Sequence, residues 1–254
     1  MPFLDIDGGR LEYKRINTDA GGARTLVMLH EGLGSIDLWK DFPEQLGRTT
    51  RSSVLVYSRH GYGKSAAVKE PRSVRYMHHE ALIVLPQLLD ALEIQNPILL
   101  GHSDGGSIAL IHAGGSGRPV AGVVALAPHV FVEDLSVSGI AAAKMAYETT
   151  ALRNKLVRYH DNVDETFWGW NDIWLSADFR AWNIEEYLPR IVCPVLAIQG
   201  EEDEYGTLEQ IRRIEKATPH VATLCLADCR HSPHRDQPQR VLDTVTDWVG
   251  KITI

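Results

Sequence analysis

The chain has 254 residues, of which 44% are hydrophobic, enough for one large domain with a well-buried core. Its formal net charge of −7 disfavours nucleic acids and anionic membranes as partners, because both repel an acidic protein. No apolar run approaches the ~20 residues of a membrane span, the N-terminus lacks the pattern of a signal peptide, and the three cysteines fit free thiols, so we expect a cytoplasmic protein.

The predicted elements alternate along the chain. Residues 3–17 are expected to form a hairpin that turns at Asp7-Gly8-Gly9. Further strands are predicted near residues 25–30, 53–58, 97–102, 120–127, 193–199 and 221–226, and helices near 38–47, 73–94, 104–115, 207–217 and 237–251. Pro86 should kink or break its helix. Strands that alternate with helices favour an α/β fold with a mostly parallel central sheet.

Residues 133–190 interrupt this alternation. The segment is rich in helix formers and aromatic residues, and we predict that it forms a helical cap. Residues 1–132 and 191–254 then make up the core.

The most specific motif is Gly101-His102-Ser103-Asp104-Gly105, which lies between a predicted strand and a predicted helix. A G-x-S-x-G in that context is typical of a nucleophile elbow, a tight turn in which the flanking glycines relieve steric crowding. The turn would present Ser103 at the N-terminus of a helix, where developing negative charge is favoured.

An acid and a histidine follow in the order that such a serine requires. Asp203 comes just after the predicted strand of residues 193–199, and His231 follows the strand of residues 221–226. Because the carboxyl ends of parallel strands share one edge of a sheet, we expect Ser103, His231 and Asp203 to meet there. Glu133 or Asp134, after the preceding strand, is the alternative position for the acid.

These motifs resemble those of the α/β-hydrolase fold family, in particular its serine hydrolases with a helical cap inserted after the sixth strand. Residues 30–35, His-Glu-Gly-Leu-Gly-Ser, resemble the oxyanion loop of that family, and residues 57–65 resemble its G-x-G-x-S turn. The resemblance covers nearly the whole chain and implies a Ser-His-Asp triad of Ser103, His231 and Asp203. It also implies that the backbone N–H groups of Asp104 and Gly32 form the oxyanion hole, with Leu33 as the fallback for Gly32.

The chain departs from the family pattern at two positions. Glu31 replaces the first glycine after His30, and Arg230 stands where a glycine often precedes the catalytic histidine. Both departures add a charged side chain near the expected site. They therefore bear on the choice of substrate and leave the reaction class unchanged.

Candidate substrate-binding residues come mainly from the predicted cap. An aromatic surface above the serine would favour an apolar or aromatic acyl group, although the same rings could instead anchor the cap. The candidates are Glu31, Trp168, Trp170, Trp174, Trp182 and His234. His30 and His102 are expected to hold the loop and the elbow in shape. No metal-ligand spacing accompanies the remaining histidines, so neither a metal nor a cofactor is expected.

We therefore expect a serine esterase that cleaves a small carboxylic ester through an acyl-enzyme. An enol-lactonase and a C–C hydrolase of ring-fission diketones remain alternatives, although the latter typically carry Asn where this chain has His102. A ligand receptor built on a retained hydrolase fold is the alternative of another class. The expected partner is a small-molecule substrate, and the sequence carries no signal of oligomeric state.

Overall fold

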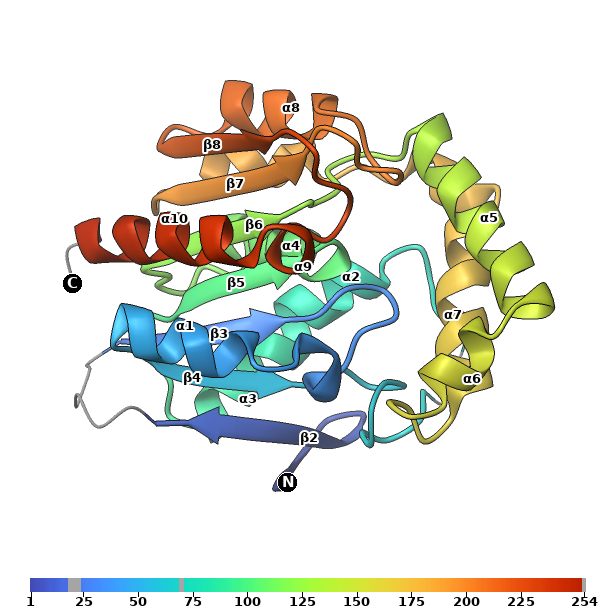
Figure 1. Cartoon of the computed structure of the whole chain (residues 1–254). Coiled ribbons are helices and arrows are strands. Elements are labelled where there is room, and N and C mark those ends of the chain that lie inside the picture. Colours follow the sequence, from blue (N-terminus) through green and yellow to red (C-terminus); the bar gives the residue numbers. More distant parts are fainter. Residues whose placement is uncertain (18–23, 69–70, 253–254) are drawn as a thin grey trace.

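The computed structural model of the chain describes residues 1–17, 24–68 and 71–252. Within them, eight strands form one sheet in the order β1-β2-β4-β3-β5-β6-β7-β8 (Figure 1). The strands are β1 (Phe3–Ile6), β2 (Gly9–Ile16), β3 (Thr25–Leu29), β4 (Ser53–Tyr57), β5 (Ile98–His102), β6 (Gly122–Leu126), β7 (Val195–Gly200) and β8 (Val221–Leu226).

The sheet is antiparallel only at its N-terminal edge. Strands β1 and β2 form the expected hairpin, and β2 pairs antiparallel with β4, whereas the pairs from β4 to β8 are all parallel. Gly8 and Gly9 have φ angles of +95° and +127°, which a glycine adopts readily and other residues do not. The chain runs outward from β3 to β4 and then returns to β5 on the other side of β3, so the strand order reverses between β3 and β5.

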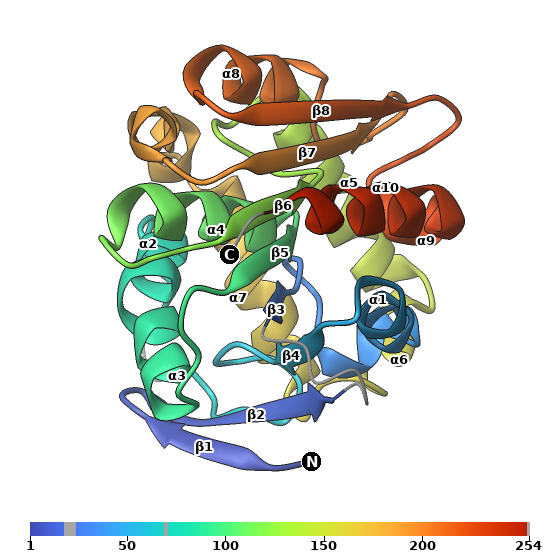
Figure 2. The same ribbon diagram turned by 90° about the vertical axis from the view of Figure 1, so that its left-hand side faces the viewer.

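Helices cover both faces of the sheet (Figure 2). On one face lie α2 (Tyr76–His79), α3 (Leu85–Ala91), α4 (Asp104–Gly115) and α8 (Glu209–Ala217). On the other lie α1 (Phe42–Thr50) and α10 (Pro238–Lys251), which is preceded by the short α9 (Pro233–Asp236). The strand residues alternate between two apolar clusters, one under each helical layer. Parallel strands buried on both faces explain why these runs are almost continuously apolar in the sequence.

Two of the predicted helices differ from expectation. The helix predicted near residues 38–47 is split into a 3₁₀ turn, η1 (Ile36–Trp39), and α1, because Lys40 takes a φ of +57° that ends the first turn. The helix predicted near residues 73–94 runs from α2 through a π-helical turn, η2 (Glu80–Val84), into α3. Pro86 lies in the first turn of α3, where its missing N–H interrupts the helical hydrogen bonds and accounts for the wide turn just before it.

A helical segment connects β6 to β7. It consists of α5 (Asp134–Thr149), α6 (Leu152–Leu156), α7 (Val163–Leu175) and the 3₁₀ turns η3 (Asp178–Ala181) and η4 (Glu185–Arg190). Helices α5, α6 and α7 lie beyond the carboxyl ends of the parallel strands, to the right in Figure 1. An isolated bridge between Phe131 and Asn183 ties the start of this segment to its end. No helix among the described residues is long and apolar enough to span a membrane.

Candidate active site

The turn between β5 and α4 is built by close backbone packing. Ser103 occupies it with φ +53° and ψ −118°, a conformation that costs a non-glycine residue about 1–3 kcal/mol. A Cβ on Gly101 would overlap the carbonyl of Gly105, and a Cβ on Gly105 would overlap the carbonyl of Leu29 at the end of β3. Only glycine therefore lets the first turn of α4 approach both β5 and β3 this closely.

Ser103, His231 and Asp203 form a continuous chain of hydrogen bonds. The Oγ of Ser103 lies 2.9 Å from Nε2 of His231, and Nδ1 of His231 lies 2.8 Å from Oδ1 of Asp203. An ionised carboxylate can only accept hydrogen bonds, so Nδ1 carries the proton and Nε2 accepts the serine hydroxyl hydrogen. The structure thus brings together the three side chains that the sequence placed just past separate strands.

Asp203 is fixed and kept ionised by its surroundings. Its Oδ1 also accepts from the backbone N–H of Tyr205 at 2.8 Å and that of Gly206 at 3.2 Å, and its Oδ2 accepts from Nε2 of Gln199 at 3.1 Å. Burial alone would raise the pKa of this carboxyl, but the charge and hydrogen bond of His231 and the N–H of Tyr205 outweigh burial and lower it. Conversely, burial lowers the pKa of His231, but Asp203 outweighs burial and raises it above the ordinary value.

The two acids that the sequence offered in place of Asp203 lie elsewhere. The Glu133 carboxylate accepts from the N–H and hydroxyl of Thr207, at 2.9 and 2.6 Å, and from Gln210 at 2.8 Å. Asp134 pairs with Arg180 on the surface. Neither carboxylate makes a hydrogen bond with His231.

Glu204 and Arg230 form a pair beside the histidine. Glu204 accepts from the backbone N–H of His231 at 3.2 Å and binds Arg230 at 3.1 Å. The Arg230 side chain is mostly exposed and does not line the cavity at Ser103. The sequence did not single out Glu204, because nothing in its sequence neighbourhood signals a contact with a residue 27 positions away.

A cavity of about 110 Å³ opens onto Ser103. Trp170 and Trp174, both on α7, line it, together with Glu31, Gly32, Leu33 and Asp104. A Cβ on Gly32 would overlap the Trp170 indole, so the α7 ring lies directly against the loop after β3. Ile140, Tyr205 and His129 complete the wall. The cavity is small, and most of its side walls are apolar.

Three of the candidate substrate-binding residues lie away from this cavity. Trp168 is half-buried, with the Lys144 ammonium 5.5 Å from the centre of its ring. Trp182 packs against Phe179, with ring centroids 5.4 Å apart. His234 is buried behind the elbow, 4.8 Å from the Trp39 ring. The structure does not bring these three to the cavity at Ser103: Trp182 and His234 belong to the packed interior, and Trp168 lies on another side of α7 from Trp170.

The two backbone N–H groups expected to form the oxyanion hole are free to donate, and hydrogen bonds hold the loop that carries one of them. Neither Gly32 nor Asp104 donates its N–H to any described residue, and both line the cavity. The carbonyl of Glu31 accepts from Nδ1 of His30 at 2.7 Å and from Nη2 of Arg59 at 2.9 Å. The other ring nitrogen of His30, Nε2, accepts from the Arg59 N–H at 3.0 Å, and burial holds the pKa of His30 well below its usual range. A neutral histidine and a buried arginine thus fix the loop.

The Glu31 side chain is ionised and points along the same wall. It lies 3.5 Å from Nδ1 of His102 and 3.5 Å from Arg235. Burial would raise the pKa of Glu31, but the hydrogen bond and charge of His102, with Arg235, outweigh burial and hold it well below the usual range. The ring of His102 in turn contacts the carbonyl of His231 through Nε2 at 2.8 Å. His102 therefore links the loop after β3 to the segment that carries His231.

A second buried carboxylate adjoins the nucleophile. Oδ2 of Asp104 accepts from the hydroxyl of Tyr76 at 2.7 Å and lies 3.5 Å from Nη2 of Arg59. Tyr76 also accepts from Nε1 of Trp174 at 3.0 Å. The other oxygen, Oδ1, is buried without a partner among the described residues. The sequence motif gave Asp104 only a backbone role, and this side-chain network became visible only in the structure.

Among residues 1–17, 24–68 and 71–252, no group of three His, Cys, Asp or Glu side chains is arranged to hold a metal ion. Cys193, Cys225 and Cys229 are all free thiols. The side chains at Ser103 are an alcohol, the imidazole of His231 and the carboxylate of Asp203, and the backbone of Gly32 and Asp104 lines the same cavity.

Comparisons with known proteins identify the family of the chain. A model of the alpha/beta hydrolase family matches residues 26–244. The proline iminopeptidase of Heyndrickxia coagulans is 21% identical over 298 residues and covers 98% of each chain. The human serine hydrolase BPHL (Homo sapiens) is 27% identical over 205 residues, which are 78% of this chain and 68% of that protein.

Solved structures show the same fold. The enol-lactonase from Burkholderia xenovorans LB400 superposes with a TM-score of 0.79 at 20% identity, covering 98% of this chain and 100% of that one. A structure from a study of carboxylesterases of Nitrososphaera gargenis gives a TM-score of 0.80 at 19% identity, covering 99% and 98%.

The buried histidines predict a loss of stability in acid. Burial lowers the pKa of His129, which lies beside His231, to about 4. Between that value and the unfolded value near 6.5, the unfolded chain binds a proton that the folded chain excludes, so stability falls as the pH falls. Replacing His129 by Gln should reduce the pH dependence of the unfolding free energy by about 1.4 kcal/mol per pH unit between pH 5 and 6. Urea unfolding across this pH range measures how the free energy of unfolding depends on pH. If this dependence is the same in the variant and the wild type, His129 is not the group responsible.

Proposed function

Because this chain belongs to the alpha/beta hydrolase family, we propose that it is a serine hydrolase that cleaves a small carboxylic ester through an acyl-enzyme. Ser103 is the nucleophile, His231 the general base and Asp203 the acid that orients the base. The observation that carries the proposal is the unbroken chain of hydrogen bonds from Ser103 through His231 to Asp203, at 2.9 and 2.8 Å, beside a cavity.

Acylation begins with attack of Ser103 Oγ on the ester carbonyl. His231 takes the serine proton at Nε2 and later gives it to the leaving alcohol. Asp203 holds the tautomer that leaves Nε2 free and stabilises the imidazolium that forms. A raised pKa of His231 supports this role, because the base then holds its proton more firmly in the intermediate. A water molecule then attacks the acyl-enzyme by the same steps, which releases the carboxylic acid and restores the Ser103 hydroxyl.

The tetrahedral intermediate carries a negative oxygen that requires donors. We propose the N–H groups of Gly32 and Asp104, with Leu33 as the alternative to Gly32. Their support is that both groups line the cavity and donate to no described residue. Asp104 is also the first residue of α4, where the helix dipole favours negative charge. Each such donor is typically worth about 3–4 kcal/mol of the barrier.

We propose that residues 133–190 act as the cap that supplies the acyl-binding wall. Helix α7 contributes Trp170 and Trp174 to the cavity, whose volume of about 110 Å³ suits a small acyl group. The described residues that line it include two carboxylates, Glu31 and Asp104, and no Lys or Arg. Arg235 already pairs with Glu31 and Arg59 with Asp104, and no described lining residue offers a free cation to an acidic substrate, so we expect the acyl group to be neutral.

Lactones are internal esters, and the same residues would open them by the same steps. The likeness to an enol-lactonase therefore adds lactones to the substrates that need testing. A hydrolase of ring-fission diketones and a ligand receptor without turnover are the competing functions. A panel of p-nitrophenyl esters, lactones and vinylogous diketones separates them, because a receptor turns over none and a C–C hydrolase prefers the diketones.

The nucleophile is tested by replacing Ser103 with Ala. The variant should fold normally and lose ester turnover, and a fluorophosphonate probe should label Ser103 of the wild type. Mass spectrometry of the labelled peptide and circular dichroism of the variant make the two measurements. Labelling elsewhere, or near-wild-type rates in the variant, would overturn the proposed mechanism.

The acid is tested by a matched pair of isosteric changes. Asp203→Asn should lower kcat by about 10⁴, as in the serine-protease template, because the amide favours the wrong histidine tautomer. Glu133→Gln should change kcat by less than about tenfold, since Glu133 makes no hydrogen bond with His231. Steady-state kinetics on one ester gives both values. The reverse ranking would move the acid to Glu133.

The acyl-binding wall is tested by two tryptophans on α7. Trp170→Ala should lower kcat/KM more for bulky acyl esters than for acetyl esters, because only the larger group loses apolar contact worth about 1–3 kcal/mol. Trp168→Ala is the control, since Trp168 does not line the cavity. An acyl-chain series is measured beside thermal unfolding. Equal losses for all esters that follow the melting temperature would show that Trp170 only anchors the helix.

A further inference from the structure

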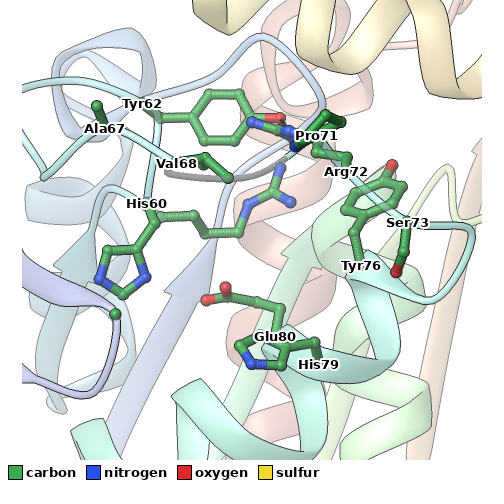
Figure 3. A pocket seen from close by; sticks show the side chains of 12 residues that line it. His60, Tyr62, Ala67, Val68, Pro71, Arg72, Ser73, Tyr76, His79 and Glu80 are labelled. Carbon is green, nitrogen blue, oxygen red and sulfur yellow. Dashed lines mark hydrogen bonds between the residues drawn. The ribbon is translucent and has the colours of Figure 1, made fainter.

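A second cavity, of about 430 Å³, lies on the other side of Arg59 and Tyr76 from Ser103. Its wall is formed by the loop after β4, the start of α2 and the π-turn η2 (Figure 3). The volume falls within the range of small-molecule sites. None of the proposed catalytic residues lines it.

Arg59 presents unused donors to this cavity. The residue is 2% exposed, and its Nη2 is engaged by the carbonyl of Glu31 at 2.9 Å. Its Nε is buried without a partner among the described residues, and its Nη1 makes no hydrogen bond to them. A buried guanidinium with unpaired N–H groups is costly, so its environment favours an acceptor that enters the cavity.

Glu80 presents an unused acceptor to the same space. It is 7% exposed, and its Oε1 accepts from the hydroxyl of Tyr57 at 2.8 Å. Its Oε2 makes no hydrogen bond among the described residues. Arg59 and Glu80 both line the cavity, and the charge of Glu80 is one of the causes that raise the pKa of Arg59. They form no ion pair, so each keeps an open position towards the cavity.

The rest of the wall determines the charge and the shape of an occupant. Arg72 lies over the Tyr62 ring, 4.4 Å from its centre, and is paired with no described carboxylate. Two arginines and one glutamate make the lining net positive when the histidines are neutral, which favours an anion. Arg59 and Arg72 both lie against the Tyr62 ring, so the apolar contact for a short carbon skeleton comes from Tyr76, Val68 and Pro71.

We propose that this cavity is a second ligand site that binds a small carboxylate with a hydroxyl or amino group on the adjacent carbon. The carboxylate accepts from the open Nη1 of Arg59, and the hydroxyl or amino group donates to Oε2 of Glu80. A plain carboxylate satisfies only the first of these partners, and a plain amine only the second.

A ligand in this cavity would affect the nucleophile through two contacts that the structure already contains. Arg59 and Tyr76 line the second cavity, and both contact Oδ2 of Asp104, the residue after Ser103. A ligand that accepts a hydrogen bond from Arg59 alters the electrostatic interaction between the Arg59 guanidinium and the Asp104 carboxylate. The ligand therefore acts on the proposed oxyanion donor from outside the cavity at Ser103.

The experiment is a calorimetric titration of the unliganded full chain with glycolate, glycine and acetate. Glycolate and glycine should bind at least about tenfold more tightly than acetate, because they gain a hydrogen bond to a charged group. Glu80→Gln keeps an acceptor for Tyr57 and should remove most of that advantage. Glu148→Gln, a change on the exposed surface of α5, is the matched control and should bind as the wild type does.

A second variant keeps the test independent of Glu80. Arg59→Lys retains the positive charge beside Asp104 but lacks the Nε and Nη1 donors, and it should weaken all three probes. Absence of binding to the wild type, equal affinity for glycolate and acetate, or unchanged affinity in both variants would overturn the proposal. Glycolate that competes with an ester substrate but is insensitive to Glu80→Gln would place binding at Ser103 and overturn it as well. Because binding is measured without turnover, failure of the proposed hydrolase activity leaves this result unaffected.

Discussion

The close approach of three backbone segments around Ser103 is the constraint on which the rest of the site depends. The first turn of α4 lies against β5 and against the end of β3 so tightly that Gly101 and Gly105 admit no side chain. This packing holds the strained conformation of Ser103, at a cost of about 1–3 kcal/mol that the buried central strands offset. It also brings the N–H of Asp104 and the loop of Gly32 to one cavity. The strand order reverses between β3 and β5, where ligands of open α/β sheets bind.

Electrostatics around this turn follow a single pattern, in which each buried carboxylate has a specific partner. Asp203 is matched by His231, Glu31 by His102, and Asp104 by Arg59. Such pairing is needed because an isolated charge away from water costs several kcal/mol. The pairing is incomplete for Asp104, Arg59 and Glu80, each of which keeps a polar atom without a partner among the described residues. Of these three residues, Arg59 and Glu80 line the second cavity, where we propose that a ligand binds.

The segment between β6 and β7 divides its aromatic side chains between two tasks. Trp170 and Trp174 stand four residues apart on α7 and therefore lie on one face of the helix, the face that lines the cavity. Trp168 is two residues from Trp170 and points elsewhere, and Trp182 packs within the segment. Because the four tryptophans lie close together in the sequence, all four were candidates for substrate binding. Helical periodicity, read more closely, already separates Trp168 from Trp170 and Trp174, whereas the position of Trp182 after the end of α7 needed the fold.

The fold class and the group of Ser103, His231 and Asp203 follow from the amino-acid sequence alone. Apolar runs and glycine-flanked turns are local signals, and in a parallel sheet any residue just past a strand's carboxyl end arrives at the same edge. The side-chain network of Asp104 with Arg59, and the cavity behind it, became apparent only from the three-dimensional structure. Those contacts join segments distant in sequence, and whether a buried polar atom finds a partner depends on packing that no local pattern records.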